Sequence, residues 1–203
     1  MSANERTVVV TGLLGYCALS AMTRLCKDGD QAPLMKDAVL HAHMADQAFH
    51  EFENLEMFAQ ENGFDLTEAS SRFAGLFDEL EARTRPSSWW ERSLKTYITF
   101  GVLGDLLQLL ATDIDVAKRE LALDFGQKDW EEEHLGVKIA ADPQLAARLS
   151  LWGRRVFGDV LGLVRATLFT YPELGLSAEE ADQLVLTAEQ NHGKRMEDLG
   201  LQP

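Results

Sequence analysis

The sequence predicts an all-α protein, from the spacing of its apolar residues, the positions of its helix caps and the lack of strand patterns. Apolar residues recur three and four positions apart over long stretches, as they do on one face of a helix. Alternating β-branched runs bounded by Asn-Gly or Asp-Gly turns are missing. We therefore expect long helices separated by short breaks along the whole chain.

Each expected helix has a recognisable start or end. Pro33 suits a first helical turn, and Gly63 suits the left-handed residue after a helix. Ser88–Glu91 and Ser177–Glu180 have the Ser-x-x-Glu form of a capping box, and Asp142-Pro143 resembles a cap followed by a first turn. The helices predicted from these signals and from the apolar periodicity span residues 6–26, 33–62, 66–83, 88–112, 116–141, 144–170 and 177–199.

The length and composition are those of one globular domain. The chain has 203 residues, and its 26% charged and 46% hydrophobic content exclude a disordered protein. No internal repeat or low-complexity linker divides it. We expect a single domain over 1–203, with a core bundle over about 6–141 and added helices over about 144–170 and 177–199.

The charge argues against nucleic acid as a partner. Lys and Arg total 19 against 33 Asp and Glu, which gives a net charge of −14. Phosphate backbones bind to clustered basic residues, so a strongly acidic surface repels them.

The apolar N-terminal run, Thr7–Met22, predicts a core helix and not a leader or a membrane anchor. Gly12, Gly15 and Ser20 make it polar for a membrane span, and Glu5 lies where a signal peptide carries positive charge. No other segment is long and apolar enough. We therefore expect a cytoplasmic protein without a membrane partner.

The two cysteines are nine residues apart and form neither a metal-binding nor a redox pair. Cys17 and Cys26 are expected to be buried free thiols.

The connection between the second and third long helices favours a ferritin-like four-helix bundle. Residues 63–87 are enough to carry the chain from one end of a bundle to the other. Ferritin-like bundles have such a crossover, whereas up-and-down bundles use short loops. In ferritin-like proteins inward-facing Glu and Glu-x-x-His residues hold two metal ions, so polar residues on the inward faces are candidate ligands.

Residues 33–62 carry two adjacent stripes. One contains alanine and phenylalanine and is expected to pack inward; its members are Ala38, Ala42, Ala45, Phe49 and Phe52. The neighbouring stripe contains His41, Met44, Ala48, Glu51 and Leu55. His41 and Glu51 would then border or enter the interior, either as satisfied core residues or as ligands.

Asp105 is the only charged residue between Lys95 and Asp113. A buried carboxylate needs a hydrogen-bonding partner, a metal or a raised pKa. Over residues 116–141, Asp124, Gln127, Glu131 and His134 follow at helical spacing, and Glu131–His134 forms a Glu-x-x-His sequence. The candidate metal ligands are therefore Glu51, Asp105, Asp124, Glu131 and His134.

His43, His50 and His192 are expected at the surface, and no phosphate-binding loop or catalytic nucleophile motif is found.

The sequence resembles actinobacterial ferritin-like proteins grouped with the tRNA methylthio-isopentenyladenosine hydroxylase. The resemblance spans nearly the whole chain and is carried by Gly15-Tyr16, Leu19–Ala21, Phe49–Leu55, Thr84–Trp89, Ile139–Pro143, Leu151–Arg155 and Arg195–Leu201. It implies the same fold and, in hydroxylases of this type, a di-iron centre that activates dioxygen.

The ligands that the resemblance implies are largely missing. Ala18 stands where the first helix would supply Glu, and Ala48–Glu51 stands where the second would supply Glu-x-x-His. Asp124–Gln127 replaces an acid-x-x-His, and the acid of the third helix corresponds to Asp105 or to Phe100.

Two functions follow as hypotheses. The first is a non-catalytic or altered-site relative that binds no cofactor. The alternative is a di-iron hydroxylase acting on a modified tRNA nucleoside or another small substrate. The missing ligands and the charge favour the non-catalytic relative. The small molecule that either would bind is not indicated.

A homodimer through the added C-terminal helices is a further expectation. Their apolar residues exceed what one packed face requires; they are Trp152, Val156, Phe157, Leu161, Leu163 and Leu168.

Overall fold

The computed structural model describes residues 4–112, 114 and 125–203, and within these residues the regular structure is entirely helical. The elements are α1 (Glu5–Asp30), α2 (Met35–Glu61), α3 (Leu66–Ser71), α4 (Asp78–Arg83), α5 (Trp89–Ala111), α6 (Gln127–Trp130), the π-helix η2 (Glu131–Gly136), α7 (Val137–Ala141), α8 (Pro143–Thr170), the 3₁₀ helix η3 (Pro172–Leu174) and α9 (Ala178–Asp198). The predicted all-α class is confirmed.

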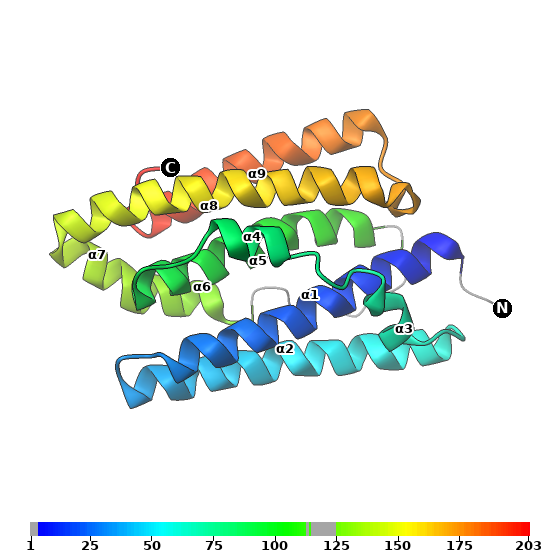
Figure 1. Cartoon of the computed structure of the whole chain (residues 1–203), viewed down its shortest axis with the longest axis horizontal. Coiled ribbons are helices and arrows are strands. Elements are labelled where there is room, and N and C mark those ends of the chain that lie inside the picture. The colour runs from blue at the N-terminus through cyan, green and yellow to red at the C-terminus, as the bar shows by residue number, and fades with distance from the viewer. Residues whose placement is uncertain (1–3, 113, 115–124) are drawn as a thin grey trace.

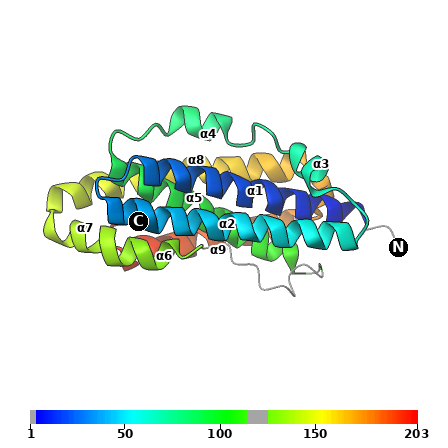
Figure 2. The ribbon, with the colours of Figure 1, turned by 90° about the horizontal axis from the view of Figure 1, so that it is seen from below.

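The long helices lie roughly side by side along one axis (Figure 1). α1 and α2 form an antiparallel pair on one side, α8 and α9 form another on the opposite side, and α5 runs between the pairs in contact with α1, α8 and α9. α2 and α5 run in the same direction, because the segment that carries α3 and α4 returns the chain along the outside of the bundle (Figure 2). This is the predicted long crossover.

The middle position of α5 explains its composition. Sixteen of its residues are buried, including Leu94, Ile98, Leu103 and Leu106. A helix that is apolar on nearly every side is typical of an element covered by neighbours all round. α8 and α9 both pack on α5, so the C-terminal helices share one core with the preceding ones.

The predicted caps are present. Ser177 and Glu180 form a complete capping box at the start of α9, and Asp142 caps α8 ahead of Pro143. The cap of α5 differs in one respect: Ser88 Oγ accepts from Glu91 N, but the Glu91 carboxylate accepts from Ser87 instead of returning to Ser88. Glu91 therefore orders the residue before the cap.

The inward face of α2 was predicted only in part, since Ala45 is buried and Phe52 packs against the core as expected. Ala42 and Phe49 of the expected stripe are exposed. The neighbouring stripe is the buried one, and its members are His41, Met44, Ala48, Glu51 and Leu55. α2 packs against α1 and α3 also contacts it, and of the two alternatives expected for His41 and Glu51, the structure shows both residues in the interior.

The helix predicted over 116–141 is interrupted. Phe125 and Gly126 have φ of 54° and 75°, so α6 begins only at Gln127, and residues 131–136 form a π-helix. Regular helical spacing therefore begins only at Gln127 within residues 125–141, and the predicted stripe member Asp124 lies outside the described residues.

Two helices of the described chain, α1 and α5, are long and apolar enough to cross a membrane by length and composition. This corrects the expectation that the first helix is too short and too polar to span a membrane. In both helices most of the apolar window is buried against other helices, as in a core helix. Cys17 is buried in α1 as expected, whereas Cys26 is exposed.

The apolar residues on which the dimer expectation rested are satisfied within the chain. Val156 and Leu161 of α8 are buried, and the other four, Trp152, Phe157, Leu163 and Leu168, pack against the core while partly exposed. A homodimer through the C-terminal helices stays a prediction.

α1 and α3 approach each other closely at Gly12. A Cβ atom on Gly12 would lie 2.6 Å from the carbonyl oxygen of Ala69, which is a backbone atom that cannot rotate away. We expect Gly12→Ala to lower the free energy of unfolding by roughly 1–3 kcal/mol, the usual effect of overpacking, in urea titrations. Gly193→Ala in α9 is the matched control, because beyond its chain neighbours and the backbone of its own helix turn no atom of the described residues lies within 4 Å of the added Cβ. Equal losses in both variants would contradict the close approach.

Candidate functional site

The five predicted ligands do not assemble. Glu51 is buried in α2, Asp105 lies on α5, and Glu131 and His134 lie on η2, while Asp124 is outside the described residues. Among the residues that the structure describes, no group of three or more His, Cys, Asp or Glu side chains is placed to hold a metal ion.

Asp105 is held by α9. Arg195 Nη1 and Nη2 donate to its two carboxylate oxygens at 3.0 and 2.8 Å, and Asn191 Nδ2 donates at 3.0 Å. The side chains of Asp105 and Arg195 are only 11% and 19% exposed. The sequence left open a hydrogen-bonding partner, a metal or a raised pKa for Asp105. The structure shows hydrogen-bonding partners, Arg195 and Asn191.

The positions that the resemblance assigns to iron ligands are buried but carry few donors. Ala18 and Ala48 are fully buried, and Phe100 and Gln127 are nearly so. Alanine and phenylalanine have no atom that can bind a metal, and a di-iron centre in this kind of bundle uses about six carboxylate and histidine ligands. The residues present do not fit a di-iron centre.

Two carboxyl groups, one on α1 and one on η2, bind to hydroxyl groups of α5 in the interior. Thr96 Oγ1 donates to Asp28 at 2.6 Å, and Ser93 Oγ donates to Glu131 at 2.6 Å. Ser93 and Thr96 are three residues apart on α5 and therefore share one of its faces. We call Asp28 and Glu131 the interior carboxyl pair.

Burial raises the pKa of both members. The pKa of Asp28 rises to about 6 through burial, against the Thr96 hydrogen bond and the charge of Arg92, which lower it. Burial, with a smaller contribution from the charge of Asp28, raises the pKa of Glu131 to about 8, against the Ser93 hydrogen bond, which lowers it. Glu131 is therefore mostly neutral at pH 7. Its second oxygen has no hydrogen-bonding partner in the described part of the chain.

Aromatic rings gather close by. The ring of His41 lies 4.6 Å from that of Trp130 and 5.6 Å from that of Trp89, and His134 stacks on Trp130 at 5.0 Å. His41 Nδ1 is 2.8 Å from the Asp37 carbonyl, which assigns the ring proton to Nδ1. Burial lowers the pKa of His41, so it is a neutral core residue and not a cation.

His192, expected at the surface, is 3% exposed and stacks on Phe157 with ring centroids 4.0 Å apart. Burial lowers its pKa to about 4. His43 and His50 are exposed, as predicted.

A second polar site lies at the surface between α1, α4 and α5. It is a cleft of about 560 Å³ with Arg24, Asp28, Asp78, Glu81, Arg85, Arg92, Lys95 and Thr96 among its lining residues. We call it the basic cleft. Asp28 belongs both to its wall and to the interior carboxyl pair, so the cleft and the interior are joined through this residue.

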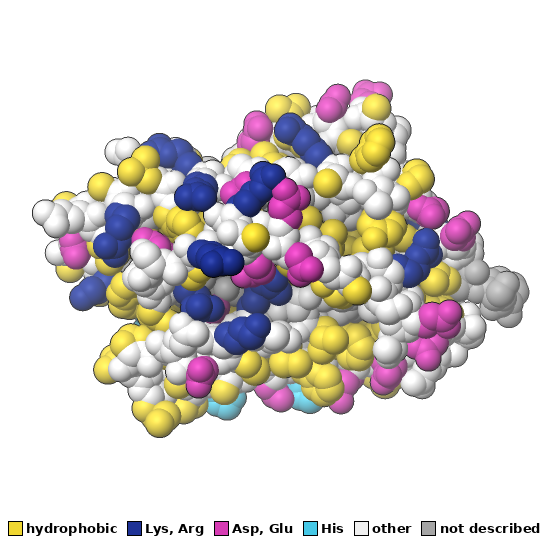
Figure 3. All heavy atoms as spheres, viewed as in Figure 1, with side chains coloured by type: hydrophobic (Ala, Val, Ile, Leu, Met, Phe, Trp, Pro, Cys, Tyr) yellow, Lys and Arg dark blue, Asp and Glu magenta, His cyan; other side chains and the backbone are white. Residues whose placement is uncertain are grey.

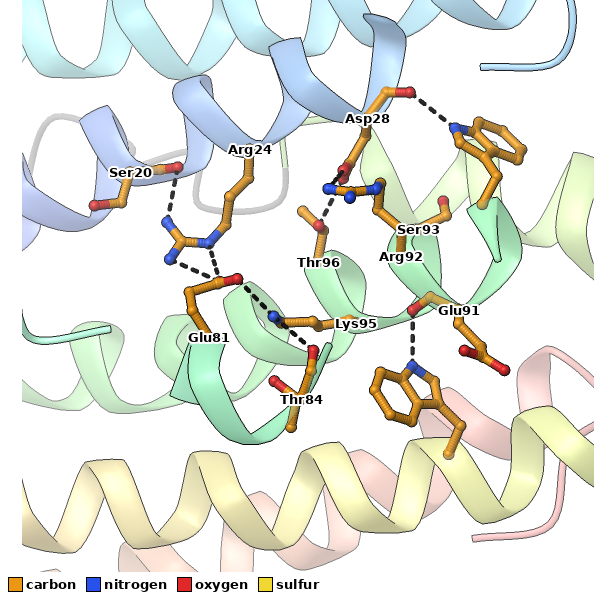
Figure 4. Close-up of polar contacts among 12 residues, drawn as sticks. Ser20, Arg24, Asp28, Glu81, Thr84, Glu91, Arg92, Ser93, Lys95 and Thr96 are labelled. Atoms are coloured by element: carbon orange, nitrogen blue, oxygen red, sulfur yellow. Dashed lines mark hydrogen bonds and ion pairs between the residues drawn. The ribbon is translucent and has the colours of Figure 1, made fainter. Parts of the chain in front are cut away.

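Figure 4 shows how the basic cleft is held together. Glu81 of α4 bridges two cations: Arg24 Nη2 lies 3.0 Å from its Oε1, and Lys95 Nζ lies 2.8 Å from its Oε2. Lys95 also donates to the Thr84 carbonyl at 3.0 Å. Burial lowers the pKa of Lys95, although its contact with Glu81 acts in the opposite direction.

The sequence analysis identified Glu131 as a candidate but missed Asp28 and the hydroxyl partners Ser93 and Thr96. Ser93 and Thr96 are small hydroxyl residues in an otherwise apolar segment, which is the one available indication, because a buried hydroxyl needs a partner. Asp28 was taken as part of a helix-ending turn, whereas α1 continues through it to Asp30.

Comparison with known proteins agrees with the fold. A family model described as a ferritin-like domain of actinomycetes matches residues 2–171, which extends from α1 through α8. A search of curated proteins gives no match.

Proposed function

Because the chain belongs to this ferritin-like domain family of actinomycetes, we propose that it is a member that has lost the di-iron centre and acts by binding rather than by catalysis. The observation that carries the proposal is the pair of fully buried alanines, Ala18 and Ala48, at two positions to which the resemblance described above assigns carboxylate ligands. We further propose, on the motifs quoted above, that it is related to tRNA methylthio-isopentenyladenosine hydroxylases, whose chemistry it would no longer perform.

The remaining donors support the proposal. Asp105 is occupied by Arg195, and Glu131 is mostly neutral at pH 7 and bonded to Ser93. A neutral carboxyl group is a poor metal ligand, since binding would have to displace its proton.

Iron content tests this. Purified protein, reconstituted anaerobically with ferrous iron and desalted, is expected to hold well under one iron per chain and to lack the absorption of an oxo-bridged iron pair. Mass spectrometry of the metal and the visible spectrum measure both. Two irons per chain would overturn the proposal.

The alternative is a di-iron hydroxylase, and one observation favours it: Glu51 and Glu131 are buried carboxyl groups on two different elements of the bundle. It predicts that Asp105→Ala and His134→Ala each abolish iron binding. Trace iron that is unchanged in both variants would reject it.

A further inference from the structure

The charge of the basic cleft is opposite to that of the chain. Four cations, Arg24, Arg85, Arg92 and Lys95, line it against three carboxyl groups, Asp28, Asp78 and Glu81. In the whole sequence, basic residues are outnumbered 19 to 33. Figure 3 shows basic side chains gathered over the middle of this face. Clustered basic side chains attract an approaching anion, even on a protein with a negative net charge.

Two of the cations, Arg85 and Arg92, have guanidinium N–H groups that can bind a ligand. Among the described residues Arg92 pairs with Asp28 alone, at 3.6 Å from its Oδ1, which is longer than an ordinary hydrogen bond. Arg85 has neither a hydrogen bond nor an ion pair within the described residues. Each guanidinium carries five N–H groups in a planar fork that matches carboxylate and phosphate oxygens.

The backbone that carries Arg85 is anchored on both sides. Thr84 is fully buried, its Oγ1 bonds to the Leu80 carbonyl, and its own carbonyl accepts from Lys95. Ser87 N donates to the Glu91 carboxylate at 2.6 Å. Arg85 is therefore attached to an ordered segment, which lowers the entropy lost when it binds a ligand.

Glu81 shows that the other two cations already hold an oxyanion. Although burial alone would raise its pKa, Lys95 and Arg24 keep the pKa of Glu81 below its usual value. Its side chain is 46% exposed on a six-residue surface helix, so solutes can reach it. Glu81 competes with any external anion for Arg24 and Lys95.

We propose that the basic cleft is a binding site for a small molecule carrying a phosphate or pyrophosphate group, held first by Arg85 and Arg92. Phosphate suits this pair because it offers several oxygens to two guanidinium forks at once. The volume of about 560 Å³ is within the range of small-molecule sites and leaves room for an organic group beside the phosphate.

Calorimetric titration with inorganic pyrophosphate tests the site on chelator-treated, full-length protein, with ionic strength matched by chloride. We expect one pyrophosphate per chain. Arg85→Ala and Arg92→Ala should each weaken binding by about tenfold or more, the loss of a charge-assisted hydrogen-bonded contact. Arg165→Ala is the control, since Arg165 is an exposed arginine of α8 outside the cleft.

Glu81→Gln provides a test with the opposite sign. Removing the resident carboxylate frees Arg24 and Lys95, so pyrophosphate should bind more tightly to this variant. Glu79→Gln is its matched control, because Glu79 lies on the same helix and pairs only with Arg83 among the described residues. If Glu81 only stabilised the fold, Glu81→Gln would lower the melting temperature and would not strengthen pyrophosphate binding.

The proposal is overturned if pyrophosphate does not bind, or if Arg165→Ala weakens binding as much as the cleft variants do. It is also overturned if Glu81→Gln binds no better than Glu79→Gln. The result is independent of the iron measurement, since the titration uses metal-free protein.

Discussion

Replacing Glu131 by glutamine is expected to raise the free energy of unfolding at mildly alkaline pH and to flatten its pH dependence. Glu131 is fully buried, and its folded pKa of about 8 lies above the ordinary 4.5. The folded state therefore binds more protons than the unfolded state between these values, and stability falls as pH rises through them. Glutamine has the shape of the neutral acid, can still accept from Ser93, and has no proton to lose.

In the window between pH 6.5 and about pH 8, Glu131 is the buried group whose shifted pKa changes the stability, whereas the exposed His50, whose pKa is raised by its hydrogen bond to Glu53, contributes equally in wild-type protein and in the variants. The raised pKa of Asp28, about 6, and the lowered pKa of His192, about 4, act below this window, and the raised pKa of Cys17 acts above pH 9.0. His192 has the opposite sign, because its stability contribution is lost as pH falls. At about 1.4 kcal/mol for each pKa unit, wild-type protein should lose about 2 kcal/mol across this window.

Urea titrations at both ends of the window measure the difference. Glu133→Gln is the control, as Glu133 is exposed on the same π-helix and should leave the slope unchanged. A wild-type slope retained in Glu131→Gln would show that Glu131 is ionised in the folded state.

Asp105→Ala should destabilise the protein by about 3 kcal/mol, because it leaves Arg195 poorly solvated and without its carboxylate. Arg195 would keep its bond to the Gly101 carbonyl, 2.9 Å long, and lose both contacts with Asp105. The loss should appear in the urea midpoint.

Two further variants serve as comparisons for the loss of stability in Asp105→Ala. Asp105→Asn keeps an acceptor for Arg195 and should lose less, whereas Asp182→Ala removes an exposed carboxylate of α9 and should be nearly neutral. If Asp105→Ala were as stable as Asp182→Ala, the ion pair would not join α9 to α5. The iron content should be the same in all three.

The helices, caps and crossover were predictable because their causes are local. A Ser-x-x-Glu cap or a Gly63 with positive φ depends on a few neighbouring residues, and apolar periodicity depends on one helix. The choice between two adjacent stripes of α2 was not local. Whether Phe49 or Ala48 packs inward depends on the side chains that α1 presents, and alanine allows the closer approach.

The candidate site was less predictable for the same reason. Asp105 could be identified as a carboxylate in need of a partner, but Arg195 lies 90 residues away and only the fold brings it near. Asp28 and Glu131 meet their hydroxyl partners across 68 and 38 residues. The π-helix added a further change, since a wider turn alters which side chains of residues 131–136 face inward.

The place of α5 between two antiparallel pairs bears on how the chain folds. α1 with α2, and α8 with α9, join neighbours in sequence, so each pair closes with a short loop and little entropy loss. α5 meets α1, α8 and α9 only after longer loops close, and its apolar sides stay exposed until then. The late step of folding is then the docking of both hairpins on one central helix, and cooperativity of the whole molecule depends on that helix.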